Sequence, residues 1–427
     1  MQTKNSAFPV TDFTAFRYKM LNWANRFNIF CLLDNQQYTF TDPAFECILA
    51  VGCKRNISLP AGNAFNELQH LYNQRQGWLF GHLGYDLKNE TEQLTSANPD
   101  GIGFSDLHFF EPEYVLKLGK AAVEIMGAAD ALAIYNDIHN CPESFSAKAT
   151  TRVAISTRFT QEEYIAAVQQ LQRHIVRGDC YEINFCQEFY AEGVALDPLA
   201  IYKQLIELSP NPFAALYKVD DRFCLCASPE RYLKKEGHLL FSQPMKGTAQ
   251  RHLLDDLQDE ASKQYLKDSA KEKSENVMVV DLVRNDLSRI CKQGSVKATE
   301  LFGVYSFPQV HQMISTVSGE LTGEELFTDI IRATFPMGSM TGAPKKRVME
   351  LIEQYERSRR GLFSGAIGYV APNGDFDFNV VIRSMFYNQS TGYLSFQTGS
   401  AITFYSDAQQ EYEECMLKAG AMLQVLA

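Results

Sequence analysis

Long apolar runs are missing from this sequence. No stretch reaches the roughly 18 consecutive apolar residues that a membrane-spanning helix requires. The N-terminal segment MQTKNSAFPVTDFTAFRYKM also lacks the apolar core of a secretion signal. We therefore expect a cytoplasmic protein that does not enter a membrane.

An excess of positive charge is missing too. The 40 lysine and arginine residues are outnumbered by 51 aspartate and glutamate residues, which gives a formal net charge of −11. A nucleic-acid-binding protein usually presents a basic face, so this class of function is disfavoured. A small anionic substrate is compatible with the charge, because a local basic pocket can lie in an acidic protein.

Cysteine pairs with the Cys-x-x-Cys spacing are the third absence. None of the ten cysteines belongs to a Cys-x-x-Cys motif, and Cys224 and Cys226 lie in a strand-like run where a free thiol behaves as a small apolar side chain. This usage is typical of a reducing compartment, so we expect neither a disulfide framework nor a zinc site. The 427 residues are 45% hydrophobic, which is ample for a large core.

Short strands dominate what can be read in the first third of the chain. Apolar runs at 27–34 and 78–86 are strand candidates, and 114–118 with 122–126 form a candidate hairpin. The polar residues between 136 and 152 are typical of a linker. We therefore divide the chain into a sheet-rich N-terminal region, residues 1–150, and a second domain, residues 151–427.

The second domain begins with a well-marked helix. Thr160 and Glu163 form a capping box, apolar residues follow at helical spacing, and Gly178 ends the helix. Towards the C-terminus, apolar segments at 365–370, 375–386 and 393–398 predict a three-stranded meander with an Asn-Gly turn.

One stretch in this domain brings an acid and an amine close together. Glu230 lies in Ser-Pro-Glu-Arg, and Lys246 lies in Pro-Met-Lys-Gly-Thr. Leu239–Phe241 predicts a buried strand that Pro244 ends, which puts Lys246 at a strand end. Taken alone, these residues are most simply explained by a surface lysine. A nucleophilic lysine would have to be desolvated or lie near another positive charge.

The two motifs together resemble the chorismate-utilising enzymes, and further motifs extend the resemblance through the second domain. It implies an α+β chorismate-binding fold, with large, mainly antiparallel sheets packed together and helices on the outside. Relatives that make anthranilate or isochorismate carry alanine at the position of Lys246. Lysine there is typical of members that aminate chorismate to 4-amino-4-deoxychorismate, a step towards 4-aminobenzoate and folate. The resemblance thus implies amination, with Lys246 as nucleophile and Glu230 as acid.

Two pairs of glutamates predict a cation site. Glu272 and Glu275 lie three residues apart, as do Glu411 and Glu414, so on helices each pair shares one face. Each pair alone is most simply a solvated helix face. On facing helices, however, they would make an oxygen-rich site for Mg²⁺. The resemblance implies that Glu275 and Glu414 bind Mg²⁺ as the cofactor, and that Glu272 and Glu411 support it through water.

The resemblance also implies contacts to chorismate. Arg383 would hold a carboxylate, although an internal ion pair with Asp377 is the alternative. With Mg²⁺ and Arg383 near the amine, we expect Lys246 to be neutral. The other implied contacts come from Gly247, Thr248, Ser339 in a glycine-rich loop, Phe363 where relatives have tyrosine, Gly399, and Lys418, which can also reach Glu414.

Two positions depart from the pattern of the family. Glu182 stands where isochorismate-forming relatives have a water-activating lysine and where relatives that aminate usually have glutamine. The missing lysine argues against hydroxylation. Gln312 stands where many relatives have histidine. His311 is one residue away and would face the other side of a strand, so we assign it no catalytic role.

The sequence leaves alternatives open. Lys246 argues against anthranilate synthase component I, the nearest alternative, and the joint presence of all these acids argues against a catalytically inactive anion- or metal-binding protein. Leu32–Asp34 weakly resembles a tryptophan-binding segment of anthranilate synthases, and we interpret it as packing. No cysteine nucleophile with a partnering histidine is evident. Ammonia is therefore expected from a separate glutamine amidotransferase subunit.

Overall fold

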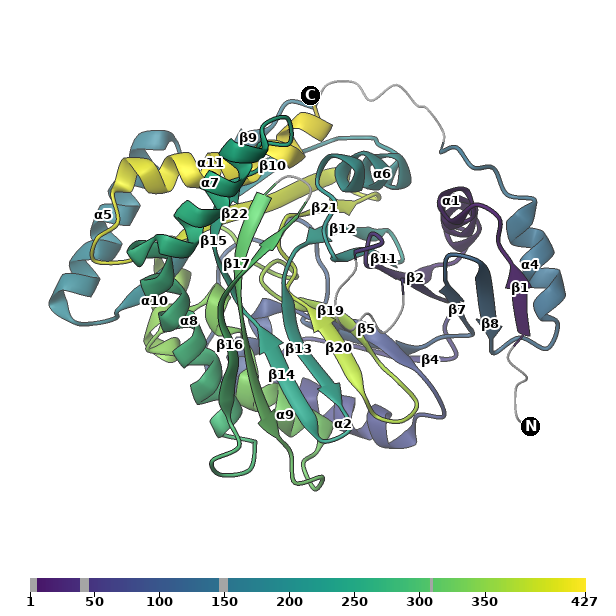
Figure 1. Ribbon diagram of the computed structural model, residues 1–427. Coiled ribbons are helices and arrows are strands. Elements are labelled where there is room, and N and C mark those ends of the chain that lie inside the picture. The colour runs from purple at the N-terminus through teal and green to yellow at the C-terminus, as the bar shows by residue number, and fades with distance from the viewer. Residues whose placement is uncertain (1–5, 39–45, 146–152, 308–309) are drawn as a thin grey trace.

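Two large antiparallel sheets organise the computed structural model, which describes residues 6–38, 46–145, 153–307 and 310–427 (Figure 1). Within these residues the first sheet has 12 strands and the second has 10. Neighbouring strands pair antiparallel in both sheets, as in β2 with β11 and β5 with β19. The expected α+β architecture of packed sheets with outer helices is confirmed.

The first sheet combines strands from both ends of the chain. Its order is β1 (Ser6–Pro9), β8 (Ala122–Met126), β7 (Tyr114–Leu118), β3 (Cys47–Val51), β2 (Ile29–Asp34), β11 (Phe213–Val219), β12 (Arg222–Ser228), β21 (Ser384–Asn388), β22 (Tyr393–Ile402), β10 (Glu182–Ala191) and β18 (Gly342–Ala343), with β9 (Ser156–Thr157) also on β10. The predicted hairpin is β7 with β8.

The second sheet also mixes distant segments. Its order is β15 (Met245–Gln250), β17 (Val310–Glu320), β14 (Leu239–Gln243), β13 (Arg231–Glu236), β20 (Phe376–Asn379), β19 (Ala366–Val370), β5 (Leu79–Leu83), β6 (Leu107–Glu111) and β4 (Arg55–Leu59), with β16 (Lys297–Ser306) also on β17. The strand predicted at Leu239–Phe241 is therefore present, but Leu239 itself is exposed.

Helices cover the outer faces of this pair of sheets. One core cluster joins the first sheet to α1 (Phe13–Ala24), α4 (Ala131–His139), α5 (Gln161–Arg177), α6 (Pro198–Leu208), α10 (Lys345–Tyr355) and α11 (Ala408–Val425). A second cluster contains residues of both sheets together with α2 (Ala64–Gln74), α8 (Ala270–Ser288) and α9 (Phe327–Thr334). The outer elements α3 (Lys88–Thr91) and α7 (Asp256–Asp268) and the single turns η1 (Tyr85–Leu87) and η2 (Gly338–Met340) complete the described structure.

Local sequence signals placed α5 correctly. Thr160 Oγ1 accepts a hydrogen bond from the backbone of Glu163, and the Glu163 side chain accepts one from the backbone of Thr160, so both halves of the capping box are present. Gly178 ends the helix in the left-handed conformation at φ 86°. The Asn-Gly turn likewise connects β19 to β20, with Gly374 at φ 86°.

The predicted three-stranded meander is wrong in its second half. β20 ends at Asn379, and the chain then leaves the second sheet and enters the first sheet as β21. A tight turn makes this change: the Ile382 amide donates to the Val380 carbonyl at 3.0 Å, and Arg383 has a φ of 52°. The turn breaks the two-residue alternation, so Asp377 and Arg383 do not share a strand face.

The two parts of the sequence do not build separate sheets. β2 and β5 of the first 150 residues pair with β11 and β19 of the later part. The predicted linker begins within α4, and its last part, residues 146–152, lies outside the described residues. The boundary near residue 150 therefore divides the sequence without dividing the sheets.

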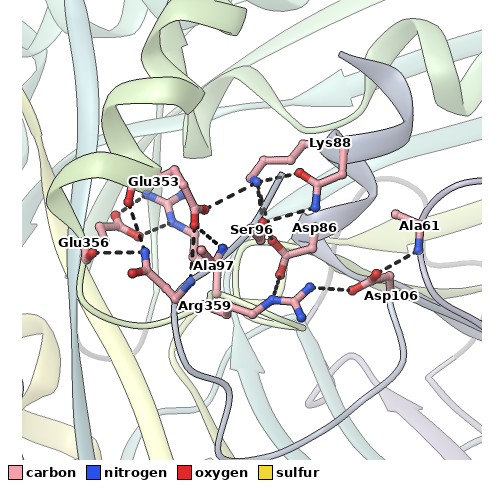
Figure 2. A network of polar contacts seen from close by, with 12 residues as sticks. Ala61, Asp86, Lys88, Ser96, Ala97, Asp106, Glu353, Glu356 and Arg359 are labelled. Carbon is pink, nitrogen blue, oxygen red and sulfur yellow. Dashed lines mark hydrogen bonds and ion pairs between the residues drawn. The ribbon is translucent and has the colours of Figure 1, made fainter. Parts of the chain in front are cut away.

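Buried polar contacts also tie the early segment 86–106 to α10 and the loop after it (Figure 2). The side chain of Lys88 is 1% exposed, and its Nζ lies 3.6 Å from Asp86 and 3.7 Å from Glu353 of α10. Arg359 donates from Nε to Asp86 and from Nη2 to Asp106, each at 3.2 Å. These contacts fix the loop that follows α10 against the N-terminal region.

A hydrogen-bonded cluster joins the two sheets in the core. The Tyr217 hydroxyl on β11 lies 3.1 Å from Nδ1 of His82 on β5 and 2.6 Å from Nδ1 of His108 on β6, and all three residues are buried. Burial lowers the pKa of His82 to about 4 and that of His108 to about 3, so both rings are neutral at pH 7. Within the residues that the structure describes, no helix is long and apolar enough to cross a membrane.

Replacing Tyr217 tests this cluster. Tyr217→Phe removes the hydroxyl and leaves two buried ring nitrogens without that partner, so we expect the free energy of unfolding to fall by about 1–3 kcal/mol. Urea denaturation at neutral pH measures the change. Tyr405→Phe, at a residue that is 90% exposed, is the control and should change stability by less than about 0.5 kcal/mol. Equal stabilities in both variants would contradict a structural role for the cluster.

Candidate active site

Lys246 is a largely buried side chain that faces the opposite sheet. Pro244 separates β14 from β15, and Lys246 lies within β15 and not after a strand end. Its Nζ is 3.2 Å from Oε1 of Glu182, on β10 of the first sheet. The Lys246 side chain is 15% exposed and that of Glu182 is 5% exposed. The alternative of a surface lysine is therefore wrong.

The charges around Lys246 favour its protonated form. Burial lowers the pKa of this amine, but the carboxylates of Glu182, Glu275 and Glu414 outweigh burial, so the pKa is raised above its ordinary value. We expected a neutral amine at Lys246. The nearest charged side chains are negative, however, so the chain's own groups favour the protonated amine.

Glu230, which the resemblance implies to be the acid, is buried. It precedes β13, is 5% exposed, and its Oε1 accepts a hydrogen bond of 2.7 Å from Ser339 Oγ. Burial raises the pKa of Glu230 to about 7, although the Ser339 hydroxyl and the Lys246 charge both act to lower it. A carboxyl group with this pKa is partly protonated at neutral pH and can donate a proton.

The segment after Lys246 is fixed by Gln312 of β17. Gly247 has a φ of 82°, and its carbonyl accepts a hydrogen bond of 2.7 Å from Gln312 Nε2, while Thr248 Oγ1 donates to Gln312 Oε1 at 3.0 Å. A Cβ on Gly247 would lie 2.9 Å from Oε2 of Glu272, so glycine lets this strand approach α8. His311 points away, with its Nε2 3.2 Å from Asp259, as the strand alternation predicted.

Both glutamate pairs lie near helix N-termini. Glu272 and Glu275 are in the first turns of α8, and Glu411 and Glu414 are in the first turns of α11, which Asp407 caps. Burial raises the pKa of Glu275 to about 7 and raises that of Glu272. Burial also acts to raise the pKa of Glu414, but Lys418 reverses the effect and lowers it.

The donor set fits Mg²⁺ in its chemistry. It consists of carboxylate oxygens, one of which, Oε2 of Glu411, is buried without a hydrogen-bond partner. The carboxylates are not gathered, however: across the described ranges no three acidic, histidine or cysteine side chains stand close enough to hold a metal. Glu414 instead lies 2.7 Å from Lys418, and Glu275 lies 3.9 Å from Lys271.

Arg383 lies in the turn where the chain changes sheets. Asp377 is taken by Arg231, which donates two hydrogen bonds to it at 3.0 and 3.1 Å, so the predicted alternative of an Arg383–Asp377 ion pair is wrong. Within the described part of the chain, no carboxylate lies within 4 Å of the Arg383 guanidinium. Burial lowers the pKa of Arg383, which Glu414 only partly offsets. An arginine in this setting is suited to an anionic ligand.

The other predicted contact residues have distinct environments. Phe363 is 2% exposed and packs in the second core cluster. The Gly399 carbonyl accepts a hydrogen bond of 2.9 Å from Lys418 Nζ, so Lys418 joins β22 to Glu414 as well. A Cβ on Gly399 would lie 1.9 Å from the Phe185 carbonyl oxygen, so the pairing of β10 with β22 requires glycine. The contacts of Phe363, Gly399 and Lys418 with chorismate stay predictions.

Three residues that support the Ser339 loop were missed from the sequence. Asn184 of β10 donates to the Ser339 carbonyl at 3.2 Å, and Arg360 donates to the Met340 carbonyl at 2.6 Å. Arg360 also forms a buried ion pair of 2.7 Å with Glu356. The four-residue spacing of Glu356 and Arg360 could have suggested their pairing, but nothing local indicates the loop that they hold.

Comparison with known proteins identifies the family. The sequence profile of the chorismate binding enzymes matches residues 29–424. This chain belongs to the chorismate-binding enzyme family. Among its relatives, aminodeoxychorismate synthase component 1 of Bacillus subtilis is 38% identical over 84% of this chain and 79% of its own, and that of Escherichia coli is 32% identical over 82% and 77%. Anthranilate synthase component I of Streptococcus pneumoniae superposes with a TM-score of 0.77 at 26% identity, covering 91% of this chain and 94% of its own.

Replacing Glu230 tests how the ionisation of this buried carboxyl group affects the stability of the protein. A carboxyl group whose pKa is raised by folding destabilises the protein as it ionises, so stability is lost as the pH rises from about 4.5 through 7. Glu230→Gln cannot ionise. We expect it to match the wild type in stability below about pH 4.5 and to exceed it by up to about 3 kcal/mol above pH 7.

Urea denaturation over this pH range measures the effect, with Glu324→Gln at an exposed position as the control. The control should follow the wild-type curve. A Glu230→Gln variant that also follows it at every pH would show that the carboxyl group is not held in its acid form.

Proposed function

We propose that this protein aminates chorismate with ammonia to form 4-amino-4-deoxychorismate, as a Mg²⁺-dependent transferase of 4-aminobenzoate and folate synthesis. The observation that carries the proposal is the joint presence of an inward-facing amine, Lys246, and a buried acid, Glu230, whose pKa of about 7 is influenced by that amine. The relatives named aminodeoxychorismate synthase component 1 support it.

Chorismate would bind between the acidic helices and the Ser339 loop. Arg383 presents a planar fork to one substrate carboxylate, while Gly399 and Lys418 lie at the end of the site formed by β22 and α11. Gly247, Thr248 and Ser339 line the side that carries Lys246 and Glu230, and Phe363 backs it with an apolar surface. When bound by Glu275 and Glu414, with Glu272 and Glu411 acting through water, Mg²⁺ supplies positive charge to the other carboxylate.

The first half of the proposed reaction exchanges oxygen for lysine. Lys246 gives up a proton and adds to C2, while Glu230 protonates the C4 hydroxyl, which leaves as water. Glu230 then takes up a proton in place of the one that it donated. The half-reaction therefore releases one water and no net proton, and leaves the Lys246 nitrogen bonded to C2.

Ammonia completes the reaction by bonding to C4 while the bond from C2 to Lys246 breaks. We propose that a separate glutamine amidotransferase subunit supplies this ammonia, in keeping with the word component in the names of the relatives. The product keeps its ring unaromatised and is released for a later enzyme.

Product identification tests the function. With chorismate, Mg²⁺ and an ammonium salt, we expect the wild type to form 4-amino-4-deoxychorismate and Lys246→Ala to lose at least about 100-fold in rate, because the nucleophile is removed. Lys235→Ala, a lysine of β13 that pairs with Asp375, is the matched control and should keep wild-type activity. Chromatography with mass detection distinguishes the products. Anthranilate would instead support anthranilate synthase, and unconsumed chorismate a non-catalytic protein.

Arg383 is tested through its effect on substrate binding. Arg383→Gln removes the charge, and we expect the KM for chorismate to rise about 10- to 100-fold because a charge-assisted hydrogen bond is lost. Arg383→Lys keeps the charge but loses the fork, so its KM should be intermediate. Steady-state kinetics at saturating ammonium measure both values. A KM that Arg383→Gln leaves unchanged would rule out the carboxylate contact.

A further inference from the structure

Glu182 has one carboxylate oxygen that the protein does not use. Oε1 lies 3.2 Å from Lys246 Nζ. Oε2 is buried and has no hydrogen-bond partner among the residues that the structure describes. The whole residue is 4% exposed, so bulk water does not solvate this oxygen freely.

The strand that carries Glu182 directs it at the reacting groups. Residues two apart on β10 share a face, so Glu182 and Asn184 point to the same side. Asn184 donates to the Ser339 carbonyl, and Ser339 in turn donates to Glu230. Glu182 therefore lies on the face of β10 that contacts Lys246 and the Ser339 loop.

An unpaired buried carboxylate oxygen is costly, and a native site usually supplies it with a donor. The carboxyl groups of Glu275 on α8, whose pKa burial raises to about 7, and of Glu414 on α11 act together with Glu182 on Lys246, which is the nearest positive charge. A ligand at Oε2 is thus favoured if it is small, positively charged and has only donors. Ammonium has this chemistry, and it would lie beside the nitrogen of Lys246.

We propose, building on the function proposed above, that Glu182 Oε2 binds the ammonium ion that provides the new amino group and removes a proton from it. This assigns a nitrogen-substrate subsite to a residue that departs from the pattern of the family.

The protons of this step balance, and the step ends with the ion pair between Lys246 and Glu182 that the structure shows. One N–H bond of ammonium breaks, its proton goes to Glu182 Oε2, and the electron pair stays on nitrogen. The resulting ammonia bonds to C4, the ring double bond shifts, and the bond from C2 to Lys246 breaks with its electron pair returning to the lysine nitrogen. Glu182 then gives its proton to the free amine, which restores the Lys246–Glu182 ion pair.

The test is the kinetic dependence on ammonium in Glu182→Gln, which keeps the shape of the side chain but cannot take up a proton. With ammonium chloride at about pH 7, we expect the KM for ammonium to rise about tenfold or more, and the KM for chorismate to change less than about twofold. The deficit should shrink towards about pH 9, where more of the added ammonium is already ammonia. Glu182→Asp, which keeps the carboxylate, should recover part of the loss.

Glu188→Gln is the matched control, because Glu188 is also buried on β10 but pairs with Arg158. It should keep the wild-type KM for ammonium. A second readout does not depend on turnover: ammonium chloride, compared with sodium chloride, should raise the Tm of the wild type more than that of Glu182→Gln.

Three outcomes would overturn the proposal. An unchanged ammonium KM in Glu182→Gln would show that Glu182 only serves as a counter-ion for Lys246, and equal increases in both KM values would point to a distorted site. A deficit that does not vary with pH would show that Glu182 takes no proton from the ammonium ion. If the wild type converts no chorismate with ammonium, the proposed function itself is rejected. If the wild type aminates chorismate and Glu182→Gln behaves identically, only this inference is rejected.

Discussion

The contact between Lys246 and Glu182 joins the two sheets at the point where the chemistry is proposed to occur. Lys246 lies on β15 of the second sheet, and Glu182 lies on β10 of the first, so their 3.2 Å separation depends on how the sheets pack. The packing buries both side chains, and the Glu182 carboxylate acts to raise the pKa of the Lys246 amine. Any change in the spacing of the sheets would alter the protonation of the proposed nucleophile.

Negative charge is the second constraint on this site. Glu275 and Glu414 reach the lysine electrostatically from two different helices, and burial leaves Glu275 with a pKa of about 7. Lys418 and Lys271 balance part of this charge from the same helices. This negative charge is the common physical basis for the two proposals, that Mg²⁺ binds near the substrate carboxylate and that ammonium binds near Glu182.

The N-terminal region supports the site through its contacts with the loop that follows α10, although we assign it no chemistry. Its segment 86–106 pairs with Glu353 and Arg359 around the end of α10 (Figure 2). The same loop carries Arg360, which binds the Met340 carbonyl next to Ser339. The early segment is therefore linked to the Glu230 side of the site by the hydrogen bonds of Arg359, Arg360 and Ser339 and by the chain between them.

The sequence by itself determined the features that neighbouring residues decide. The capping box of α5, the Asn-Gly turn after β19 and the shared helix faces of Glu272 with Glu275 follow from spacing, because their partners lie within a few residues. Only the tertiary structure decided that the chain changes sheets before Arg383 and that Glu182 meets Lys246. Both depend on how strands distant in sequence pack, and a pattern confined to one segment carries no information about the segment opposite.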